Sequence, residues 1–282
     1  MQKTTGQINY APLSKKVTPV EREIFLNTFD RKEKVQINRW ILVILAGAAL
    51  WGMTLFITPI NIILILFIVA SILLVEKLKT NKLLDYSLRL WIFSRANNWK
   101  YEHKSPVPTG GFIFELGHFH CADDTIYVTH ADISFAVGSI SYTIKHDKNN
   151  QTLHWLYVSI PLSQKLPHML LDAKQNDTSL FGIAISNLPK VFTRRQKISL
   201  GEDFDKYFTL YAPKGYEHDV RTVLTPEVMA ILIDKSPAFD VEIVDDKLFF
   251  IWKAHGVCRQ IIKICQHFLN ELSQLQLHSD IS

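Results

Sequence analysis

A run of 36 residues without a charged side chain, from Trp40 to Val75, constrains the fold of this chain more than any other feature. As one straight α-helix it would extend about 54 Å, at about 1.5 Å per residue, whereas the hydrocarbon core of a bilayer is about 30 Å thick. Pro59 disfavours helical geometry at the residue before it, and Asn61 adds a turn former. We therefore expect two transmembrane helices, 40–57 and 60–78, joined by a very short turn.

The alternative for this run is a helical hairpin buried inside a soluble protein. Two adjacent segments that are almost wholly apolar leave no polar face for water, which favours the bilayer. The run contains no ionisable side chain, and proton relays and ion pathways in membranes depend on such groups. We therefore predict that the hairpin anchors the protein and does not transport.

Basic residues flank the predicted hairpin. Eight Lys and Arg precede Trp40, six follow the run before position 101, and the turn has none. By the positive-inside rule, both termini then face the cytoplasm. We expect Trp40, Trp91, Lys77 and Lys79 to be membrane anchors, because tryptophan rings and extended lysine side chains reach the head-group level.

The net charge of +4 hides two unlike parts of the chain. Residues 1–100 carry 14 Lys and Arg against 6 Asp and Glu, whereas residues 101–282 carry 17 against 21. The basic excess lies beside the predicted hairpin, where anionic lipid head groups attract it. A nucleic-acid-binding domain usually has a basic face, so the mildly acidic second part predicts no nucleic-acid partner.

Residues 1–39 form a basic segment in which we expect one short amphipathic helix. Thr18 and Glu21 make a capping box, with proline at the first helical position between them. This helix could lie on the lipid surface or against the soluble domain. After the hairpin we expect a juxtamembrane helix over 79–104 and a linker over 105–111, whose prolines and glycines interrupt helices.

From residue 112 the apolar residues recur with a period of two. Short β-branched and aromatic runs, broken by Gly, Asn, Asp or Pro, predict an antiparallel sheet. The expected strands are 112–121, 124–130, 133–146, 152–162 and 181–186, followed by a strand, turn and strand over 198–213. Residues 146–151 suit a hairpin loop, and 166–177 suit a short structured connection.

Helices complete the predicted domain 112–282. Thr225 caps a short helix with Pro226 at its first position. Residues 239–254 suit a hairpin with two aspartates at its tip, and 256–277 an amphipathic helix packed on the sheet. The fold class is therefore α+β: an N-terminal two-helix transmembrane hairpin, then an antiparallel β-sheet domain with a capped short helix and a C-terminal amphipathic helix.

Candidate chemistry is sparse. His118 and His120 share one face of a predicted strand, with Cys121 on the other face and Asp123 beyond. Two imidazoles could hold a metal, but a site needs three or four ligands. No nucleophile elbow, zinc-protease or phosphate-loop motif occurs, and three cysteines do not make a disulfide framework. We predict no catalytic residue, no metal and no cofactor.

An aromatic cluster is the best candidate for partner binding. Phe204, Tyr207, Tyr211 and Tyr216 lie close together in sequence, and aromatic residues are enriched where proteins dock. The alternative is that they pack in the core between sheet and helix, which the alternation around Phe208 favours.

The segments "FDKYFTLY" and "LTPEVM", in this order after the apolar run, carry a family resemblance. The chain resembles a broad group of uncharacterised bacterial two-span membrane proteins with a cytoplasmic α+β domain. The resemblance covers most of the chain after Trp40 and implies a bacterial inner-membrane location. That group has no established activity, so no functional residue carries over.

These observations predict a membrane-anchored protein-interaction module, a scaffold or tether without catalysis on the cytoplasmic face of a bacterial inner membrane. Its expected partners are the lipid bilayer and another membrane or cytoplasmic protein, and its oligomeric state is open. The alternative is a membrane-associated enzyme, or a ligand or metal sensor, that uses His118, His120 and Asp123. In a third reading, the basic segments sense anionic lipid.

Overall fold

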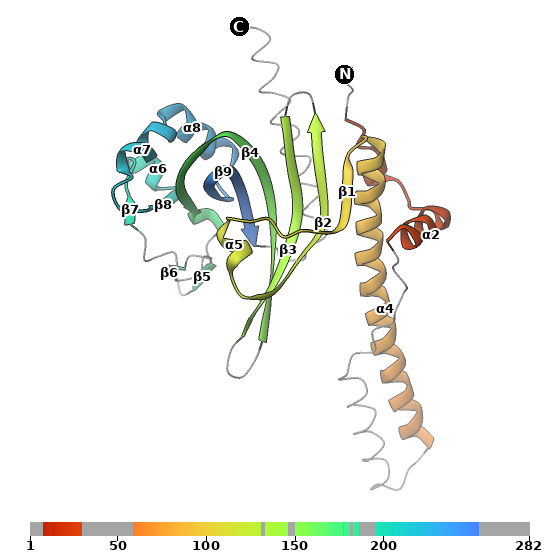
Figure 1. Cartoon of the computed structure of the whole chain (residues 1–282). Coiled ribbons are helices and arrows are strands. Elements are labelled where there is room, and N and C mark those ends of the chain that lie inside the picture. The colour runs from red at the N-terminus through yellow and green to blue at the C-terminus, as the bar shows by residue number, and fades with distance from the viewer. Residues whose placement is uncertain are drawn as a thin grey trace. The chain divides into compact units, whose positions relative to one another are not determined.

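The structure is a computed structural model that describes residues 8–29, 59–130, 133–145, 150–176, 178–180, 183–185 and 196–253. The chain divides into two compact units. One unit is Ser14–Trp91, and the other combines Met1–Leu13 with Ile92–Ser282. Figure 1 labels most of the elements of both units.

The unit Ser14–Trp91 begins with the capped helix α2 (Pro19–Thr28). Thr18 Oγ1 accepts a hydrogen bond from the backbone N–H of Glu21 at 3.2 Å, and a Glu21 carboxylate oxygen accepts from the N–H of Thr18 at 2.8 Å. The Thr18 backbone N–H and the Thr18 hydroxyl both donate to the Glu21 carboxylate and hold the pKa of Glu21 below its ordinary value. The predicted capping box is confirmed. Phe25 is fully buried, with its ring 5.6 Å from that of Trp91, so α2 packs against the protein itself.

The second helix of this unit, α4 (Pro59–Ala96), corrects the membrane prediction. The predicted first span, 40–57, lies outside the described residues, and 60–78 belongs to one continuous helix of 38 residues. Over the part of the chain that the structure describes, no helix is both long enough and apolar enough to cross a membrane. This finding contradicts the transmembrane hairpin, the fold class that contains it, and the inner-membrane location with cytoplasmic termini.

The prediction divided this region into a membrane span ending at Leu78 and a juxtamembrane helix over 79–104. The two form one continuous helix, which runs through charged residues for about five turns beyond Leu78 and ends at Ala96, where the predicted helix was too long. Its later turns bury Leu84, Leu88 and Leu90. Several of the large apolar side chains described within the uncharged run are by contrast exposed: Phe67, Leu73, Leu74 and Val75.

The larger unit is built on a seven-stranded antiparallel sheet (Figure 1). Six strands lie side by side and a seventh pairs with β4; a separate pair of short strands forms a second sheet. In order across the large sheet they are β1 (Lys100–Ser105), β2 (His118–His130), β3 (Ile133–Lys145), β4 (Asn150–Ala173), β8 (Phe208–Ala212) and β7 (Gln196–Ile198), with β9 (Asp240–Lys253) beside β4. The small sheet pairs β5 (Thr178–Leu180) with β6 (Ile183–Ile185).

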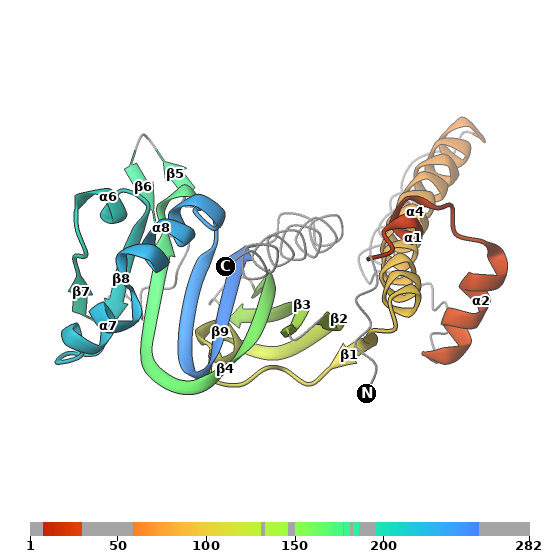
Figure 2. The ribbon, with the colours of Figure 1, turned by 90° about the horizontal axis from the view of Figure 1, so that it is seen from above.

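Two long strands, β4 and β9, curve together through the sheet (Figure 2). The predicted hairpin over 239–254 is wrong, because β9 is one strand that pairs with β4 on both sides of Asp245. Asp245 has a φ of 51°, and the register shifts where it faces β4. A bulge and a hairpin tip both accept aspartate at positive φ, so the sequence fits either. The predicted connection over 166–177 is likewise strand as far as Ala173.

The core lies against this curved sheet and is capped by α5 (Phe112–Glu115). The predicted strand over 112–121 therefore starts as a helical turn, because Phe112, Ile113 and Phe114 are all buried and a strand would expose alternate residues. The Phe114 ring lies 5.3 Å from that of Tyr157. The other core members are Ile140, Tyr142, Trp155, Leu170, Tyr211, Val244, Phe249 and Ile251.

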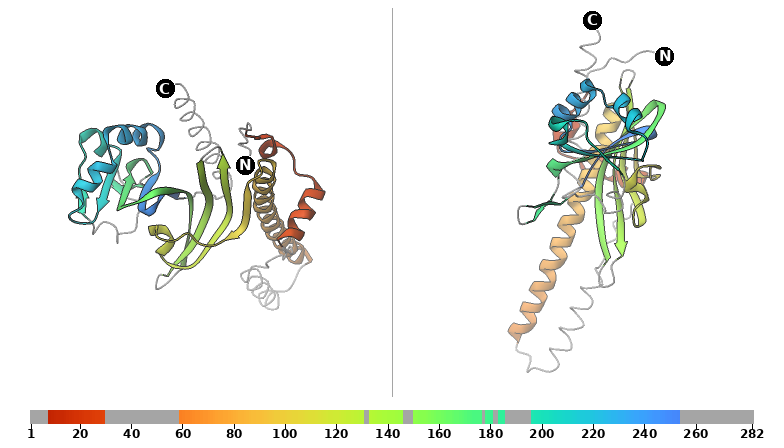
Figure 3. Two further views of the ribbon diagram at one scale, coloured as in Figure 1. Left: turned by 45° about the horizontal axis from the view of Figure 1, so that its top comes forward. Right: turned by 90° about the vertical axis from the view of Figure 1, so that its left-hand side faces the viewer.

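The remaining helices are short. Three of them, α6 (Glu202–Asp205), α7 (Glu217–Val223) and α8 (Pro226–Lys235), gather at one end of the sheet (Figure 3). Thr225 Oγ1 accepts from the N–H of Val228 at 3.4 Å, which confirms the predicted cap. The others are α1 (Ala11–Ser14) and the 3₁₀ turn η1 (Lys174–Asn176). The predicted C-terminal helix, 256–277, lies outside the described residues.

Candidate functional site

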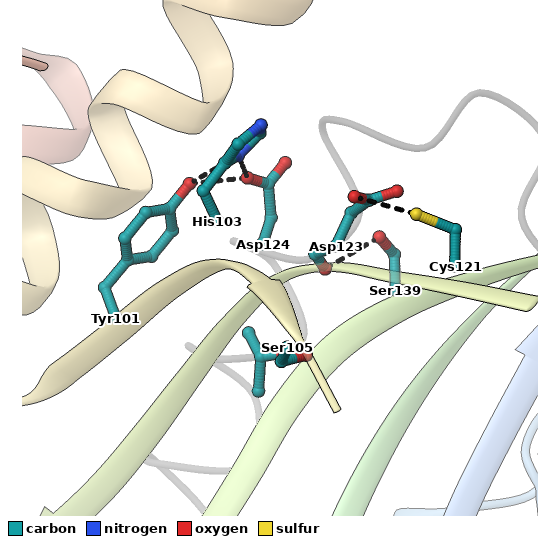
Figure 4. Close-up of polar contacts among 8 residues, drawn as sticks. Tyr101, His103, Ser105, Cys121, Asp123, Asp124 and Ser139 are labelled. Atoms are coloured by element: carbon teal, nitrogen blue, oxygen red, sulfur yellow. Dashed lines mark hydrogen bonds and ion pairs between the residues drawn. The ribbon is translucent and has the colours of Figure 1, made fainter. Parts of the chain in front are cut away.

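A cluster of three polar side chains joins β1 to β2 (Figure 4). Tyr101 and His103 are alternate residues of β1, and Asp124 belongs to β2. The Tyr101 hydroxyl donates to Asp124 Oδ1 at 2.5 Å, and His103 Nδ1 lies 2.9 Å from the same oxygen. A carboxylate oxygen only accepts hydrogen bonds, so both neighbours donate to it. His103 and Asp124 are both buried, and we call these three residues the polar cluster.

A bulge in β2 makes this arrangement possible. Asp124 has a φ of 53°, and the pairing of β2 with β3 shifts between Asp123 and Ile126. Consecutive residues of a regular strand point to opposite faces, yet Figure 4 shows Asp123 and Asp124 on the same side of β2. Aspartate visits the left-handed region more readily than most residues. The bulge therefore lets two successive aspartates serve two different neighbours.

Asp123 is engaged with β3 and with its own strand. Its backbone carbonyl accepts from the Ser139 hydroxyl at 3.0 Å, and its Oδ1 accepts from the Cys121 thiol at 3.3 Å (Figure 4). Burial and the neighbouring Asp123 carboxylate raise the pKa of Cys121. Because the thiolate is the nucleophilic form, this environment disfavours Cys121 as a nucleophile.

A chain of hydroxyl groups runs from β1 through β2 to β4. Ser105 Oγ and Thr125 Oγ1 lie 2.6 Å apart, and Thr125 Oγ1 lies 3.2 Å from the Tyr157 hydroxyl. Burial raises the pKa of Tyr157. Gly138 makes room for these groups, since a Cβ there would be 2.6 Å from Thr125 Oγ1 and 2.8 Å from the Tyr157 oxygen. Both contacts are shorter than real Cβ atoms tolerate.

The residues that the sequence offered as metal ligands do not come together in one site. Phe119 has a φ of 57°, and the register of β2 shifts between His118 and Cys121, which breaks the alternation assumed for the two histidines. His118 is exposed, whereas His120 Nε2 lies 2.6 Å from the carbonyl oxygen of Leu116. Among the described residues, no group of three or more His, Cys, Asp or Glu could hold a metal ion.

The aromatic cluster divides into two classes. Phe204 and Tyr211 are buried, and the ring of Phe204 stacks on that of Phe208 at 5.2 Å. Tyr207 is 36% exposed and Tyr216 is 44% exposed. The first two residues therefore belong to the core, and the other two remain candidates for contact with a partner.

Helix α8 lies at the same end of the sheet (Figures 1 and 3), and it carries further exposed apolar residues. Val228 is 36% exposed and Ile231 is 50% exposed, three residues apart on one side of the helix. We call Tyr207, Tyr216, Val228 and Ile231 the α6–α8 set. Large apolar residues on a helix usually face the core, so their exposure here is the feature that needs a physical reason.

The predicted membrane anchors fall in different places. Trp91 is buried beside Phe25. Lys77 and Lys79 belong to α4, and Trp40 lies outside the described residues.

Sequence reasoning missed the polar cluster because it placed residues 79–104 in a helix. The signal was present: Tyr101, His103 and Ser105 are polar residues at a spacing of two, which is the period of a strand. The strand β1 starts at Lys100, four residues after α4 ends.

No protein-family model and no curated protein matches the sequence of this chain. Among solved structures, the chain is similar to the crystal structure of the mycobacterial trehalose monomycolate transport factor A, TtfA. The similarity has a TM-score of 0.41 and 8% sequence identity, and it covers 65% of this chain and 92% of that one. At this level we infer neither a shared fold nor a shared function.

Proposed function

We propose that this protein is a protein-interaction module without catalysis, and that it binds a partner protein through the α6–α8 set. The observation that carries the proposal is the exposure of four large aromatic and aliphatic side chains in this part of the fold. Aromatic residues with one polar end are enriched at protein interfaces, because they bury a large area and still hydrogen-bond at the rim.

The chemistry of this region indicates what the partner offers. Val228 and Ile231 present aliphatic groups, and the exposed carboxylates of Glu227 and Asp234 lie on the same helix. A segment with apolar side chains and basic neighbours would complement both features. The acidic residues also have local roles. Hydrogen bonds from its own backbone N–H and from the Thr225 hydroxyl lower the pKa of Glu227, and Asp234 Oδ2 lies 3.2 Å from Lys235 Nζ.

The polar cluster supports a structural role more than a catalytic one. Its three side chains bind one another across β1 and β2, and two of them are buried. The raised pKa of Cys121 removes the nearest thiol from consideration as a nucleophile. We therefore assign the cluster to holding β1 on the sheet.

The test is an affinity purification of the full-length protein from its native cells, with quantitative mass spectrometry. Tyr216→Ala combined with Ile231→Ser removes two members of the α6–α8 set, and Val20→Ala combined with Ile24→Ser changes two exposed residues of α2 as a matched control. Truncating an interface hot spot costs about 2 kcal/mol, or about 30-fold in affinity.

We expect a stoichiometric partner with the unaltered protein and with the α2 control, and its loss with the α6–α8 variant. Recovery of the same partner by all three proteins would refute the assignment of this surface. Absence of any stoichiometric partner from the unaltered protein would refute the proposed function.

A further inference from the structure

Residues 9–13 belong to the larger unit and contact it where α4 ends and β1 begins. The Asn97 side chain pairs with both backbone groups of Asn9, which lies 88 positions earlier in the chain. Asn97 Oδ1 accepts from the Asn9 N–H at 2.8 Å, and Asn97 Nδ2 donates to the Asn9 carbonyl oxygen at 3.1 Å. A neighbouring strand pairs with a backbone through the same two kinds of group. The Asn97 amide therefore binds this segment by its backbone.

The sequence at the end of α4 places Asn97 for this contact, because the helix ends in a Schellman motif. Asn98 takes a φ of 56°, and its N–H donates to the Arg95 carbonyl oxygen at 3.2 Å. The N–H of Trp99 donates to the Ser94 carbonyl oxygen at 2.8 Å. Asparagine adopts this left-handed conformation more readily than most residues. Two asparagines in succession thus end the helix and supply the amide that binds the segment.

The next residue of the segment covers an aromatic pair. The Tyr10 ring stacks on that of Phe93 with 5.9 Å between their centroids, and the Phe93 ring meets that of Trp99 edge to face at 5.3 Å. Phe93 is fully buried. Asn97 Nδ2 also donates to the Phe93 carbonyl oxygen at 2.9 Å. The amide and the ring that receive the segment therefore belong to the same helix end.

We propose that residues 9–13 are a strap that opens and closes on this junction while the sheet stays folded, and that Asn97 is the residue that holds it closed. Both bonds between Asn97 and Asn9 are exposed, and water replaces exposed hydrogen bonds at little cost. The bonds run from a side chain to the strap, so breaking them separates no pair of strands. Release of the strap uncovers the Phe93 ring. The strap does not depend on the function proposed above.

The test is amide hydrogen exchange of the full-length protein, measured at single residues by NMR. The N–H of Asn9 donates to Asn97 and reports the strap, whereas the N–H groups of residues 155–159 in β4, which pairs with β3 and β9, report the fold. We expect protection of the Asn9 N–H that does not change with low concentrations of urea, because a local opening exposes little surface. Protection in β4 should fall as urea is added.

Asn97→Ala removes both bonds, and we expect it to raise exchange at Asn9 at least about tenfold more than exchange in β4. Asn9→Ala is the matched control, because it removes the same kind of side chain from the other partner and keeps the backbone groups that Asn97 binds. In this control, protection of residue 9, corrected for its intrinsic exchange rate, should stay within about threefold. Asn9 Oδ1 accepts from the Ala11 N–H at 3.1 Å, so protection should fall at Ala11 instead.

Three results would overturn the proposal. An unprotected Asn9 N–H in the unaltered protein would show that the segment is not bound. Exchange at Asn9 that follows urea as β4 does would show that the segment opens only with the whole fold. Equal exchange at residue 9 in Asn97→Ala and Asn9→Ala would show that Asn97 does not hold the strap. Protection in β4 verifies that each variant is folded.

Discussion

Asp124 serves the fold in two ways that substitutions can separate. Its backbone takes a φ of 53°, and its carboxylate accepts hydrogen bonds from Tyr101 and His103. Asp124→Asn keeps a residue that tolerates positive φ but removes the charge. Asp124→Gly keeps the backbone and removes the hydrogen bonds, whereas Asp124→Ala removes the hydrogen bonds and also opposes the backbone conformation.

The magnitudes follow from these losses. A hydrogen bond to a charged group contributes about 1.5 to 3 kcal/mol, and a neutral one about 0.5 to 1.5. We expect Asp124→Asn to lower the free energy of unfolding by about 1 kcal/mol and Asp124→Gly by about 3 kcal/mol. Forcing a non-glycine side chain into the left-handed region costs about 1 to 2 kcal/mol, so Asp124→Ala should lose about 4 kcal/mol. Alanine is normally more stable than glycine within a strand, so this order is inverted.

The assay is urea unfolding of the full-length protein, followed by tryptophan fluorescence. The slope of the unfolding free energy against urea concentration should be equal across the variants. Equal slopes would show that unfolding exposes the same amount of surface in each variant, so that the midpoints of the transitions report stability. Tyr101→Phe is the control for a single hydrogen bond and should cost about 1 kcal/mol. An Asp124→Ala protein at least as stable as Asp124→Gly would refute the role of the backbone. If Asp124→Ala and Asp124→Gly each lowered the free energy of unfolding by less than about 0.5 kcal/mol, the role of the carboxylate would be refuted.

Two further predictions concern the sheet. Gly138→Ala should destabilise the protein by about 1 to 3 kcal/mol through its clash with Thr125 Oγ1, and Thr125→Ala should relieve part of that loss, as a double-mutant cycle in urea would measure. Additive losses would exclude this contact. Burial raises the pKa of Tyr142 to about 12. Its ordinary pKa is about 10, so this contribution to the free energy of unfolding is fully present below pH 10 and falls by about 3 kcal/mol as the pH rises to 12. Tyr142→Phe should flatten this decline in unfolding measurements between about pH 9.5 and 11.5, and an unchanged decline would assign it to other groups. The same variant should cost about 1 to 3 kcal/mol at neutral pH, because Trp155 Nε1 now donates to the Tyr142 hydroxyl at 3.1 Å.

Helix starts could be predicted because their chemistry is local. The caps at Thr18 and Thr225 depend on bonds that span three residues, and both form as their sequences indicate. The strand over 133–145 also follows its alternating pattern. In each case, the residues that decide the structure are neighbours in sequence.

The features that the sequence did not predict depend on residues that are distant in sequence. Whether Asp245 forms a hairpin tip or a bulge is decided by β4, which faces it about 80 positions earlier in the chain. The polar cluster joins residues 21 and 23 positions apart, and its bulge lies where the pairing of β2 with β3 shifts. The sequence of the uncharged run likewise does not reveal what surrounds it in the protein, since apolar side chains are compatible with more than one environment. Phe67 and Leu74 of this run are exposed, so composition left the surroundings of these side chains open.

The distribution of polar and apolar groups bears on function. A catalytic site needs polar groups that a substrate can reach, whereas a docking surface needs exposed apolar groups. In the described part of this chain, His103 and Asp124 are buried and hydrogen-bonded to each other, while Tyr216 and Ile231 are exposed. The polar side chains thus hold β1 on the sheet, and the apolar ones are available for contact. Surface variants of α8 are therefore the first test of the proposed docking surface.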